Sequence, residues 1–133
     1  MRTVFADTFY FLALLDSKEK EHEQAVCAAR DPGLRIVTTE WVLAEFGDAY
    51  CRPGDRADFI SLYHSLTKNP RVKIIPAETA LFQRGVKFFE QRQDKKWSLT
   101  DCLSFVSMLD EGITEALTGD KHFEQAGFTV LLK

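Results

Sequence analysis

The sequence predicts a single α/β domain built on a mainly parallel central sheet of about five strands, with helices on both faces. Short apolar runs rich in β-branched residues alternate with longer segments that carry apolar residues at helical spacing. Strands that alternate with helices usually pair in parallel and are covered on both faces. With 133 residues and no repeat, linker or low-complexity segment, the chain matches one domain over residues 1–133.

The composition is that of a globular protein without a strongly charged surface. Hydrophobic residues make up 45% of the chain, charged residues 28%, and the formal net charge is -3. The overall charge therefore gives no sign of a nucleic-acid partner, although a local basic patch is enough to contact phosphates. No apolar run approaches the roughly eighteen residues of a membrane span, and Asp7 comes too early for a signal peptide.

Three cysteines, Cys27, Cys51 and Cys102, lie far apart and include no closely spaced pair. An odd number at these spacings favours structural thiols in a reducing compartment over a disulfide framework or a zinc site. We therefore expect a cytoplasmic protein that does not contact a membrane.

Five segments are expected to form strands and six to form helices. The strands are residues 3–6, 34–38, 72–75, 114–118 and 128–132. The helices are residues 9–15, 19–30, 40–50, 56–68, 76–94 and 98–111, and residues 119–123 form a loop or short turn. The helix over residues 98–111 has almost no polar side, so it is expected to be buried.

Hydroxyl and carboxyl side chains stand where helices are expected to begin. The candidate N-caps are Asp7 or Thr8, Thr38 or Thr39, and Ser98 or Thr100. The apolar side of the helix over residues 76–94 is expected to be Leu81, Val86, Phe88 and Phe89. Aromatic residues expected in the core are Phe9, Phe11, Phe46 and Phe105, while Trp41 and Trp97 suit core or dimer contacts better than base stacking.

Four acids stand at the edges of apolar segments. Asp7 follows the first strand and Asp120 the fourth, and ligands of parallel sheets bind beyond the carboxyl ends of the strands. Glu45 lies about 9 Å along its helix, on or near the buried face, and can point back over this edge. Asp101 occupies the first turn of the buried helix, where the helix dipole favours a negative charge. Each acid alone also fits a cap, a turn or a surface charge.

Together the four acids indicate a cation site. Two carboxylates about 4–5 Å apart repel by roughly 3–4 kcal/mol at an effective dielectric constant near 20, so a cluster needs protons or cations. Oxygen ligands suit Mg²⁺ or Mn²⁺. One such ion can activate water, and a second can stabilise the leaving oxygen, in the cleavage of a phosphodiester.

Four segments resemble the acidic motifs of PIN-domain ribonucleases, especially the VapC-type toxins of toxin–antitoxin systems. They are Asp7 after the first strand, residues 39–45 (TEWVLAE), residues 99–101 (LTD) and residues 118–123 (TGDKHF). The likeness spans nearly the whole chain, in order and at similar spacing. It implies an endoribonuclease dependent on Mg²⁺ or Mn²⁺, which is usually a homodimer and is inhibited by an antitoxin whose tail enters the active-site groove.

The resemblance also assigns roles by position. Asp7, Glu45, Asp101 and Asp120 correspond to the metal-binding and catalytic acids. Thr118, and less directly Thr8, correspond to hydroxyls that support them. Glu40 competes with Glu45 for the helical position, but the acid of the family follows a run like residues 42–44, which favours Glu45.

The histidines and the basic residues are expected to have smaller functional roles than the four acids. The histidines His22, His64 and His122 show no metal-ligand spacing, so surface or packing roles are favoured, with His122 singled out because it stands beside Asp120. Basic residues that can form a phosphate-contacting rim are Arg2, Arg52, Arg56, Arg92, Lys95, Lys96 and Lys121. For each of them alone, an ordinary solvated charge is the better interpretation.

Three other functions are weighed against the nuclease. A haloacid dehalogenase phosphatase expects a second Asp two residues after the first, where this chain has Phe9. A receiver domain explains Lys121 but leaves Glu45 and Asp101 without a role. A non-catalytic module that binds RNA or a protein partner is the alternative from another functional class. Neither a Gly-rich phosphate loop nor a Ser-His-Asp order is present.

Overall fold

The computed structural model describes all of residues 1–133 and contains one sheet of five strands in the order β3-β2-β1-β4-β5. The strands are β1 (Arg2–Ala6), β2 (Leu34–Thr39), β3 (Val72–Ile75), β4 (Glu115–Leu117) and β5 (Thr129–Val130). Every neighbouring pair is parallel. The predicted α/β class and parallel sheet are therefore confirmed, with β4 and β5 shorter than expected.

The first strand is the centre of the sheet. Phe5 lies opposite Val37 of β2 on one side and Ala116 of β4 on the other. Val4, Phe5 and Ala6 are all fully buried, as expected for a parallel strand that is covered on both faces. Asp7 follows directly, so its side chain stands at the middle of the carboxyl edge of the sheet.

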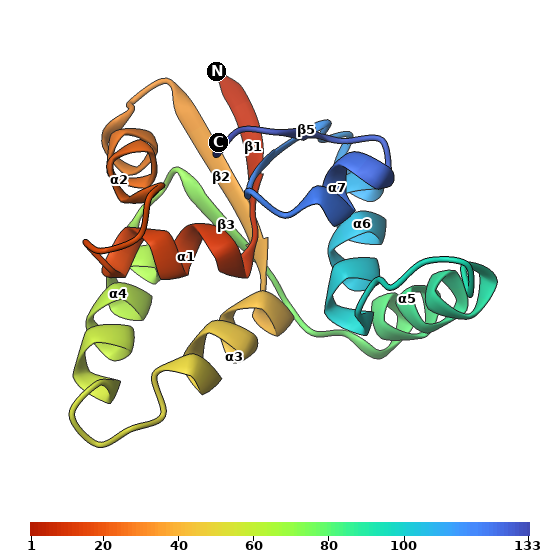
Figure 1. Ribbon diagram of the computed structural model, residues 1–133, viewed down its shortest axis with the longest axis horizontal. Helices are drawn as coiled ribbons and strands as arrows, with labels where there is room; N and C mark the ends of the chain where they lie inside the picture. The colour runs from red at the N-terminus through yellow and green to blue at the C-terminus, as the bar shows by residue number, and fades with distance from the viewer.

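Seven helices cover the sheet: α1 (Thr8–Leu15), α2 (His22–Arg30), α3 (Glu40–Ala49), α4 (Arg56–Lys68), α5 (Thr79–Gln91), α6 (Leu99–Glu111) and α7 (Lys121–Gln125). Figure 1 shows α1, α2 and α4 on one side of the sheet, α5, α6 and α7 on the other, and α3 below the ends of the strands. The strand order explains this arrangement. From β1 the chain adds β2 and then β3 toward one edge of the sheet, and it then crosses back to add β4 and β5 toward the other edge. Because connections between parallel strands are right-handed, the helices of the first two connections and those of the last two lie on opposite faces.

Side chains cap three of the helices, and Asp120 does so at the start of α7 by accepting a hydrogen bond from the backbone N–H of His122. Thr39 caps α3 by accepting a hydrogen bond from the backbone N–H of Val42. Ser98 caps α6 in a reciprocal capping box with Asp101. Asp7 occupies the N-cap position of α1 without a capping hydrogen bond from its side chain, which leaves its carboxylate for other contacts. The expected short turn after residue 119 is the five-residue helix α7.

The fifth helix is shorter than predicted by three residues at each end, because it begins at Thr79 and ends at Gln91. Pro76 is compatible with the first turn of a helix. However, the backbone N–H of Ala77 donates a 2.6 Å hydrogen bond to the carboxylate of Glu40 on α3, which holds this stretch outside the helix. The later start of α5 thus coincides with a contact from a distant part of the chain.

The predicted apolar side of α5 is wrong for two residues. The helix packs on α6 at Gly85, where an added Cβ would stand 2.3 Å from Cδ2 of Leu103. Val86 and Phe89 are exposed, at 37% and 46% of their surface, and Phe88 is half-buried. A close approach of the two helix backbones at a glycine thus replaces burial of the larger side chains.

Most of the expected aromatic core is confirmed. Phe11, Phe46 and Phe105 are fully buried, and Trp97 is buried as well. Phe9 is only half-buried, because its ring lies over Gly119 at the surface of the acidic edge. The half-buried Trp41 packs at 6.3 Å, centroid to centroid, on Phe82 of α5.

Candidate active site

Asp7 is a buried carboxylate at the end of the central strand. Only 5% of its surface is exposed, and Thr118 Oγ1 donates a 2.9 Å hydrogen bond to its Oδ2. Burial raises its pKa to about 7, although hydrogen bonds from Thr118 and the backbone of Thr8 favour the ionised form. The negative charges of Asp101 and Glu45 raise the pKa further. The carboxylate therefore needs a neighbouring positive charge to ionise fully.

Asp120 is held by the turn that follows β4. Its backbone N–H donates a 3.1 Å hydrogen bond to Thr118 Oγ1, and its Oδ1 accepts one of 2.9 Å from the backbone N–H of His122. The same threonine hydroxyl therefore bonds to Asp7 and to the backbone of Asp120. This joins the loop after β1 to the loop after β4.

Asp101 is held by the start of α6. Its Oδ2 accepts a 3.1 Å hydrogen bond from the backbone N–H of Ser98, and its own N–H donates one of 3.0 Å to Ser98 Oγ. Only 8% of its surface is exposed. A capping role and a place at the acidic edge are combined in one side chain, so a rigid buried helix fixes this carboxylate.

Glu45 reaches the acidic edge from α3. Its Oε1 accepts a 2.5 Å hydrogen bond from Thr8 Oγ1 at the start of α1. The residue is exposed and does not stand against the buried face, because Val42 and Phe46 turn inward while Glu45 follows the rim. Glu40, the competing acid on this helix, bonds to the loop before α5 and does not line the acidic cavity.

His122 was expected to pack or to face solvent, and the structure places it within the acidic group. Its Nδ1 lies 3.0 Å from Asp101 Oδ2 and 3.5 Å from Asp120 Oδ1. The only sequence signal was an Asp-x-His spacing after a strand, which is not a ligand spacing on a regular helix. The tight turn into α7 folds the imidazole back over the carboxylates.

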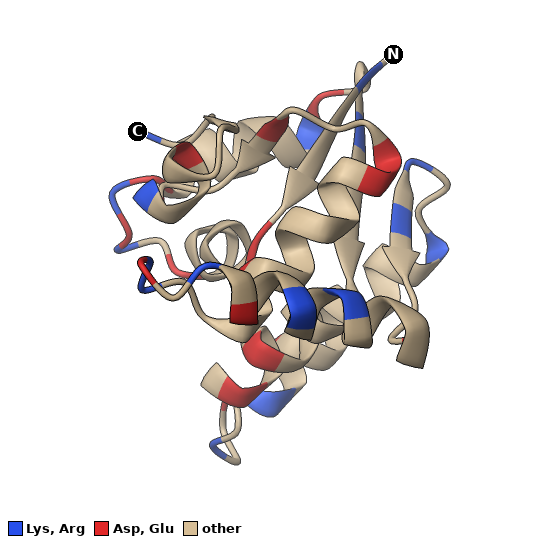
Figure 2. Ribbon diagram, turned by 90° about the vertical axis from the view of Figure 1, so that its right-hand side faces the viewer, with Lys and Arg blue, Asp and Glu red and all other residues tan.

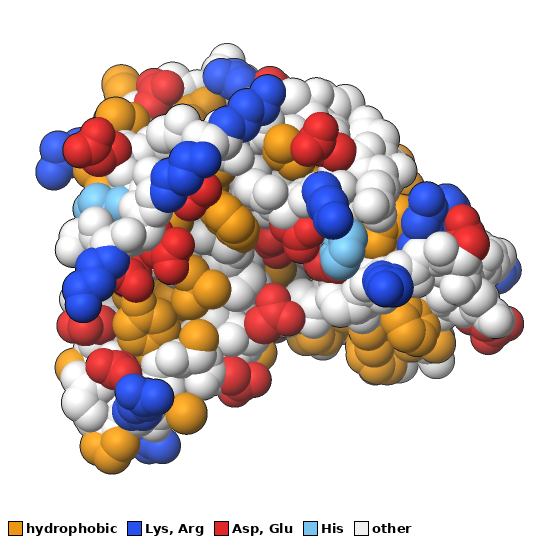
Figure 3. Space-filling view, viewed as in Figure 1, with side chains coloured by type: hydrophobic (Ala, Val, Ile, Leu, Met, Phe, Trp, Pro, Cys, Tyr) orange, Lys and Arg blue, Asp and Glu red, His pale blue; other side chains and the backbone are white.

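These side chains line a single cavity of about 360 Å³ at the carboxyl edge of the sheet. Figure 3 shows acidic side chains and a histidine in the hollow between the two lobes of the molecule. The ten lining residues are Asp7, Thr8, Phe9, Leu12, Glu45, Lys96, Ser98, Asp101, Asp120 and His122. All four acids singled out in the sequence are thus brought together, with Thr8 on the wall and Thr118 buried behind Asp7.

The donor set fits a hard divalent cation. Asp101, Asp120 and His122 each offer one ligand atom, and these atoms all lie within 4.8 Å of one another. Carboxylate oxygens suit Mg²⁺ and Mn²⁺, and an imidazole nitrogen is compatible with Mn²⁺. A cation here would also relieve the repulsion that helps to raise the pKa of Asp7.

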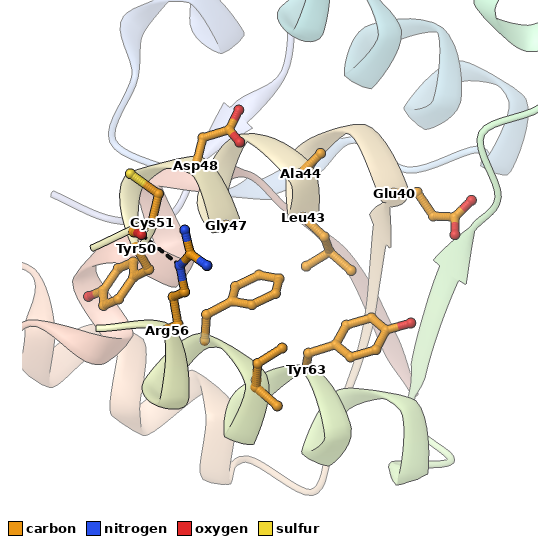
Figure 4. Close-up of a pocket in the computed structure, with 11 residues that line it drawn as sticks. Glu40, Leu43, Ala44, Gly47, Asp48, Tyr50, Cys51, Arg56 and Tyr63 are labelled. Carbon is orange, nitrogen blue, oxygen red and sulfur yellow. Dashed lines mark hydrogen bonds between the residues drawn. The ribbon is translucent and has the colours of Figure 1, made fainter. Parts of the chain in front are cut away.

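A second hollow, of about 520 Å³, lies between α3 and α4 and is lined mainly by hydrophobic residues. Figure 4 shows Leu43 and Tyr63 facing this space, with Arg56 at one end. Arg56 Nε donates a 2.7 Å hydrogen bond to the carbonyl oxygen of Cys51. None of the four clustered acids lines the hollow, so it is separate from the candidate metal site. The three cysteines are all free.

Basic side chains are dispersed over the molecule, as Figure 2 shows on the α5–α7 side. Arg2, one of the expected rim residues, instead pairs with Glu115 at 2.7 Å. Lys96 is the only lysine or arginine that lines the acidic cavity. The predicted basic rim is therefore reduced at the cavity itself to one residue.

Comparison with known proteins identifies the fold and the family. The PIN domain family matches residues 4–129. No curated protein sequence matches significantly. None of the helices combines the length and apolar character needed to cross a membrane.

Solved structures share the fold over nearly the whole chain. VapC20 of Mycobacterium tuberculosis, a toxin that cleaves the sarcin-ricin loop, has a TM-score of 0.85 at 22% identity, covering 98% of this chain and 99% of that one. VapBC2 from Rickettsia felis, bound to a promoter DNA fragment, has a TM-score of 0.68 at 12% identity over 97% of both chains. VapBC-1 from nontypeable Haemophilus influenzae has 0.66 at 16% identity, over 97% of this chain and 96% of that one. The family match covers most of the sequence, and the chain belongs to the PIN domain family.

Proposed function

We propose that the protein is an endoribonuclease that hydrolyses RNA phosphodiester bonds with Mg²⁺ or Mn²⁺. The observation that carries the proposal is the cavity at the carboxyl edge of the sheet, where Asp7, Glu45, Asp101 and Asp120 meet from four separate segments of the chain. Clustered carboxylates repel one another and destabilise the fold unless a cation lies between them. Their presence here is explained if the cavity binds such a cation.

The four acids have different contacts, which suit them to different roles. Asp101 and Asp120, with His122 beside them, would hold a divalent cation, and Asp7 and Glu45 would complete its surroundings. A bound cation supplies Lewis-acid activation of water and of the phosphodiester. Thr118 holds the orientation of Asp7, and Thr8 holds that of Glu45.

We further propose that the protein is the toxin of a type II toxin–antitoxin pair. The likeness to VapC20, itself a toxin, and to two VapBC structures supports this assignment and an antitoxin partner. A homodimer is proposed with it, from the resemblance to the VapC-type toxins. Three free cysteines are compatible with a reducing compartment, and we place the activity in the cytoplasm. A small reading frame with a DNA-binding segment directly upstream of this one would support the pairing.

The deciding experiment is RNA cleavage by the purified chain in Mg²⁺, in Mn²⁺ and in EDTA, with the cut sites mapped. We expect cleavage only with metal, and a loss of about 100-fold or more in Asp101→Asn. Asp48→Asn, which changes an exposed aspartate on α3, is the matched control. Cleavage that persists in EDTA would refute the proposal. RNA retention without cleavage in Mn²⁺ would favour the non-catalytic binding module.

A further inference from the structure

A third cavity, distinct from the hollow between α3 and α4, adjoins the acidic one. It has a volume of about 600 Å³ and is lined by eight residues from the end of α5 and the loop before α6. Lys96 lines both cavities, so the two are neighbours on one continuous surface. Whatever polymer occupies the acidic cavity must pass Lys96 to extend in this direction.

The charge of this third cavity is opposite to that of the acidic cavity. Arg92, Lys95 and Lys96 line it, against the single lining acid Glu90, and Arg92 is itself paired with Asp94 at 3.2 Å. The carboxylates of the acidic cavity repel phosphates, and a cation bound there would neutralise only the phosphate that it contacts. The binding free energy for the neighbouring phosphates of an RNA strand must therefore come from basic groups outside the acidic cavity.

The cavity also offers aromatic surface. Phe89 is 46% exposed although it belongs to a helix that packs on α6. The guanidinium of Arg92 lies 4.9 Å from the ring centroid of Trp97, whose Nε1 donates a 3.1 Å hydrogen bond to Gln125 Oε1. Flat apolar and guanidinium surfaces next to lysines are the combination that binds unstacked nucleotides.

We propose that this cavity binds a nucleotide of a single-stranded RNA next to the one held at the acidic site, an inference that rests on the proposed function. The exposed ring of Phe89 stacks on the base, and Lys95 and Lys96 contact the flanking phosphates. Single-stranded RNA is specified because a base inside a duplex cannot stack on a protein ring. The excess of positive charge favours a polyanion over a second copy of this acidic chain.

The test measures RNA binding without cleavage. Fluorescence anisotropy of a labelled single-stranded RNA of about twelve nucleotides is recorded in EDTA with the full chain. Phe89→Ala is expected to weaken binding about tenfold, through loss of stacking. Lys95→Ala is expected to weaken it several-fold and to reduce the salt dependence of log K by about one unit.

The chain supplies matched controls on the same helix. Phe82 is also an exposed aromatic residue of α5, and Lys87 an exposed lysine, and neither lines the cavity. Phe82→Ala and Lys87→Ala are expected to bind the RNA like the wild type. Equal affinities for all four variants would overturn the proposal. So would Phe89→Ala sedimenting as a smaller species with unchanged RNA affinity, since a second copy would then be the occupant.

The outcome separates the nucleotide site from the nuclease activity. If the wild type never cleaves RNA with metal, yet Phe89→Ala and Lys95→Ala lose RNA binding, the nucleotide site stands and the proposed hydrolysis fails. If cleavage requires metal and these variants bind RNA like the controls, the nucleotide site alone fails.

Discussion

Thr118 Oγ1 donates a 2.9 Å hydrogen bond to Asp7 Oδ2 and accepts one of 3.1 Å from the backbone N–H of Asp120. One fully buried hydroxyl thus connects two acids that are more than a hundred residues apart in the sequence. It fixes the carboxylate at the end of β1 relative to the loop after β4. The consequences of this link for stability and activity can be measured.

Thr118→Val keeps the shape of the side chain and removes the hydroxyl. We expect the free energy of unfolding to fall by roughly 1–3 kcal/mol, because a buried carboxylate and a backbone N–H lose their partner. The pKa of Asp7 should rise further, because this hydrogen bond lowers it. Urea unfolding measures the first effect. Thr67→Val is the control, since the exposed Thr67 hydroxyl bonds only to the carbonyl of His64; equal losses in the two variants would contradict the prediction.

The titration of Asp7 should lower the free energy of unfolding of the metal-free protein as the pH rises from about 4 to about 7. Its pKa is about 7 in the folded chain against an ordinary value of 3.8, so the folded state binds more protons across this interval. The decrease attributable to this group is of the order of 4 kcal/mol.

Urea unfolding in EDTA at about pH 5 and pH 8 measures this effect as the difference between the wild type and Asp7→Asn. Exposed carboxylates such as Asp110, whose pKa is lowered by Arg84, act in the opposite direction in both proteins and cancel in the comparison. Parallel pH dependences in the two proteins would show that Asp7 does not titrate as described.

Added Mg²⁺ should raise the melting temperature of the wild type, because an ion that binds only the folded state stabilises it. The rise should be smaller in Asp7→Asn, which lacks one of the charges that attract the ion. Thermal unfolding with and without millimolar Mg²⁺ tests this at constant ionic strength. An equal rise in both proteins would argue that Asp7 does not belong to the metal site.

The two glutamates of α3 should differ in their effect on cleavage. Glu45→Gln removes a charge that lines the acidic cavity, and we expect RNA cleavage to fall about 100-fold. Glu40→Gln changes a carboxylate that instead bonds to the N–H of Ala77, so cleavage should stay within a few-fold of the wild type. Initial cleavage rates at saturating Mg²⁺ decide between them, and the opposite ranking would assign the helical acid to Glu40.

The close approach of α5 and α6 should make Gly85→Ala destabilising. A Cβ at this position would stand 2.3 Å from Leu103 Cδ2, so the helices must separate or the leucine must leave its rotamer. Overpacking of this kind costs roughly 1–3 kcal/mol, which urea unfolding can measure. Gly54→Ala, with no atom within 4 Å of the added Cβ, is the control and should leave stability nearly unchanged.

The sheet and the meeting of the acids were predictable because both follow from chain order. Apolar runs that alternate with helices fold into parallel strands, and the residues after those strands share one edge. Asp7 and Asp120 are placed by this rule alone. The choice of Glu45 over Glu40 came from the resemblance to a family, and the contact of Glu40 with Ala77 explains it only in the folded chain.

Other features depend on contacts that periodicity does not encode. Val86 and Phe89 have the spacing of core residues, yet the contact of α5 with α6 is made at Gly85. His122 joins the acids only because the turn into α7 brings it back to Asp101, 21 residues earlier in the chain. Side chains placed by such tertiary turns leave no periodic signal in the sequence.

The central position of β1 has a consequence for synthesis of the protein. The ribosome makes β1 before the other four strands, but one of its two neighbours, β4, and the loop that carries Asp120 follow more than a hundred residues later. A nascent chain interrupted before Thr118 therefore holds Asp7 without the threonine and the acid that complete its surroundings. The carboxylate cluster is therefore assembled only after residues 118–120 have been made, so a nascent chain that lacks them holds no formed site.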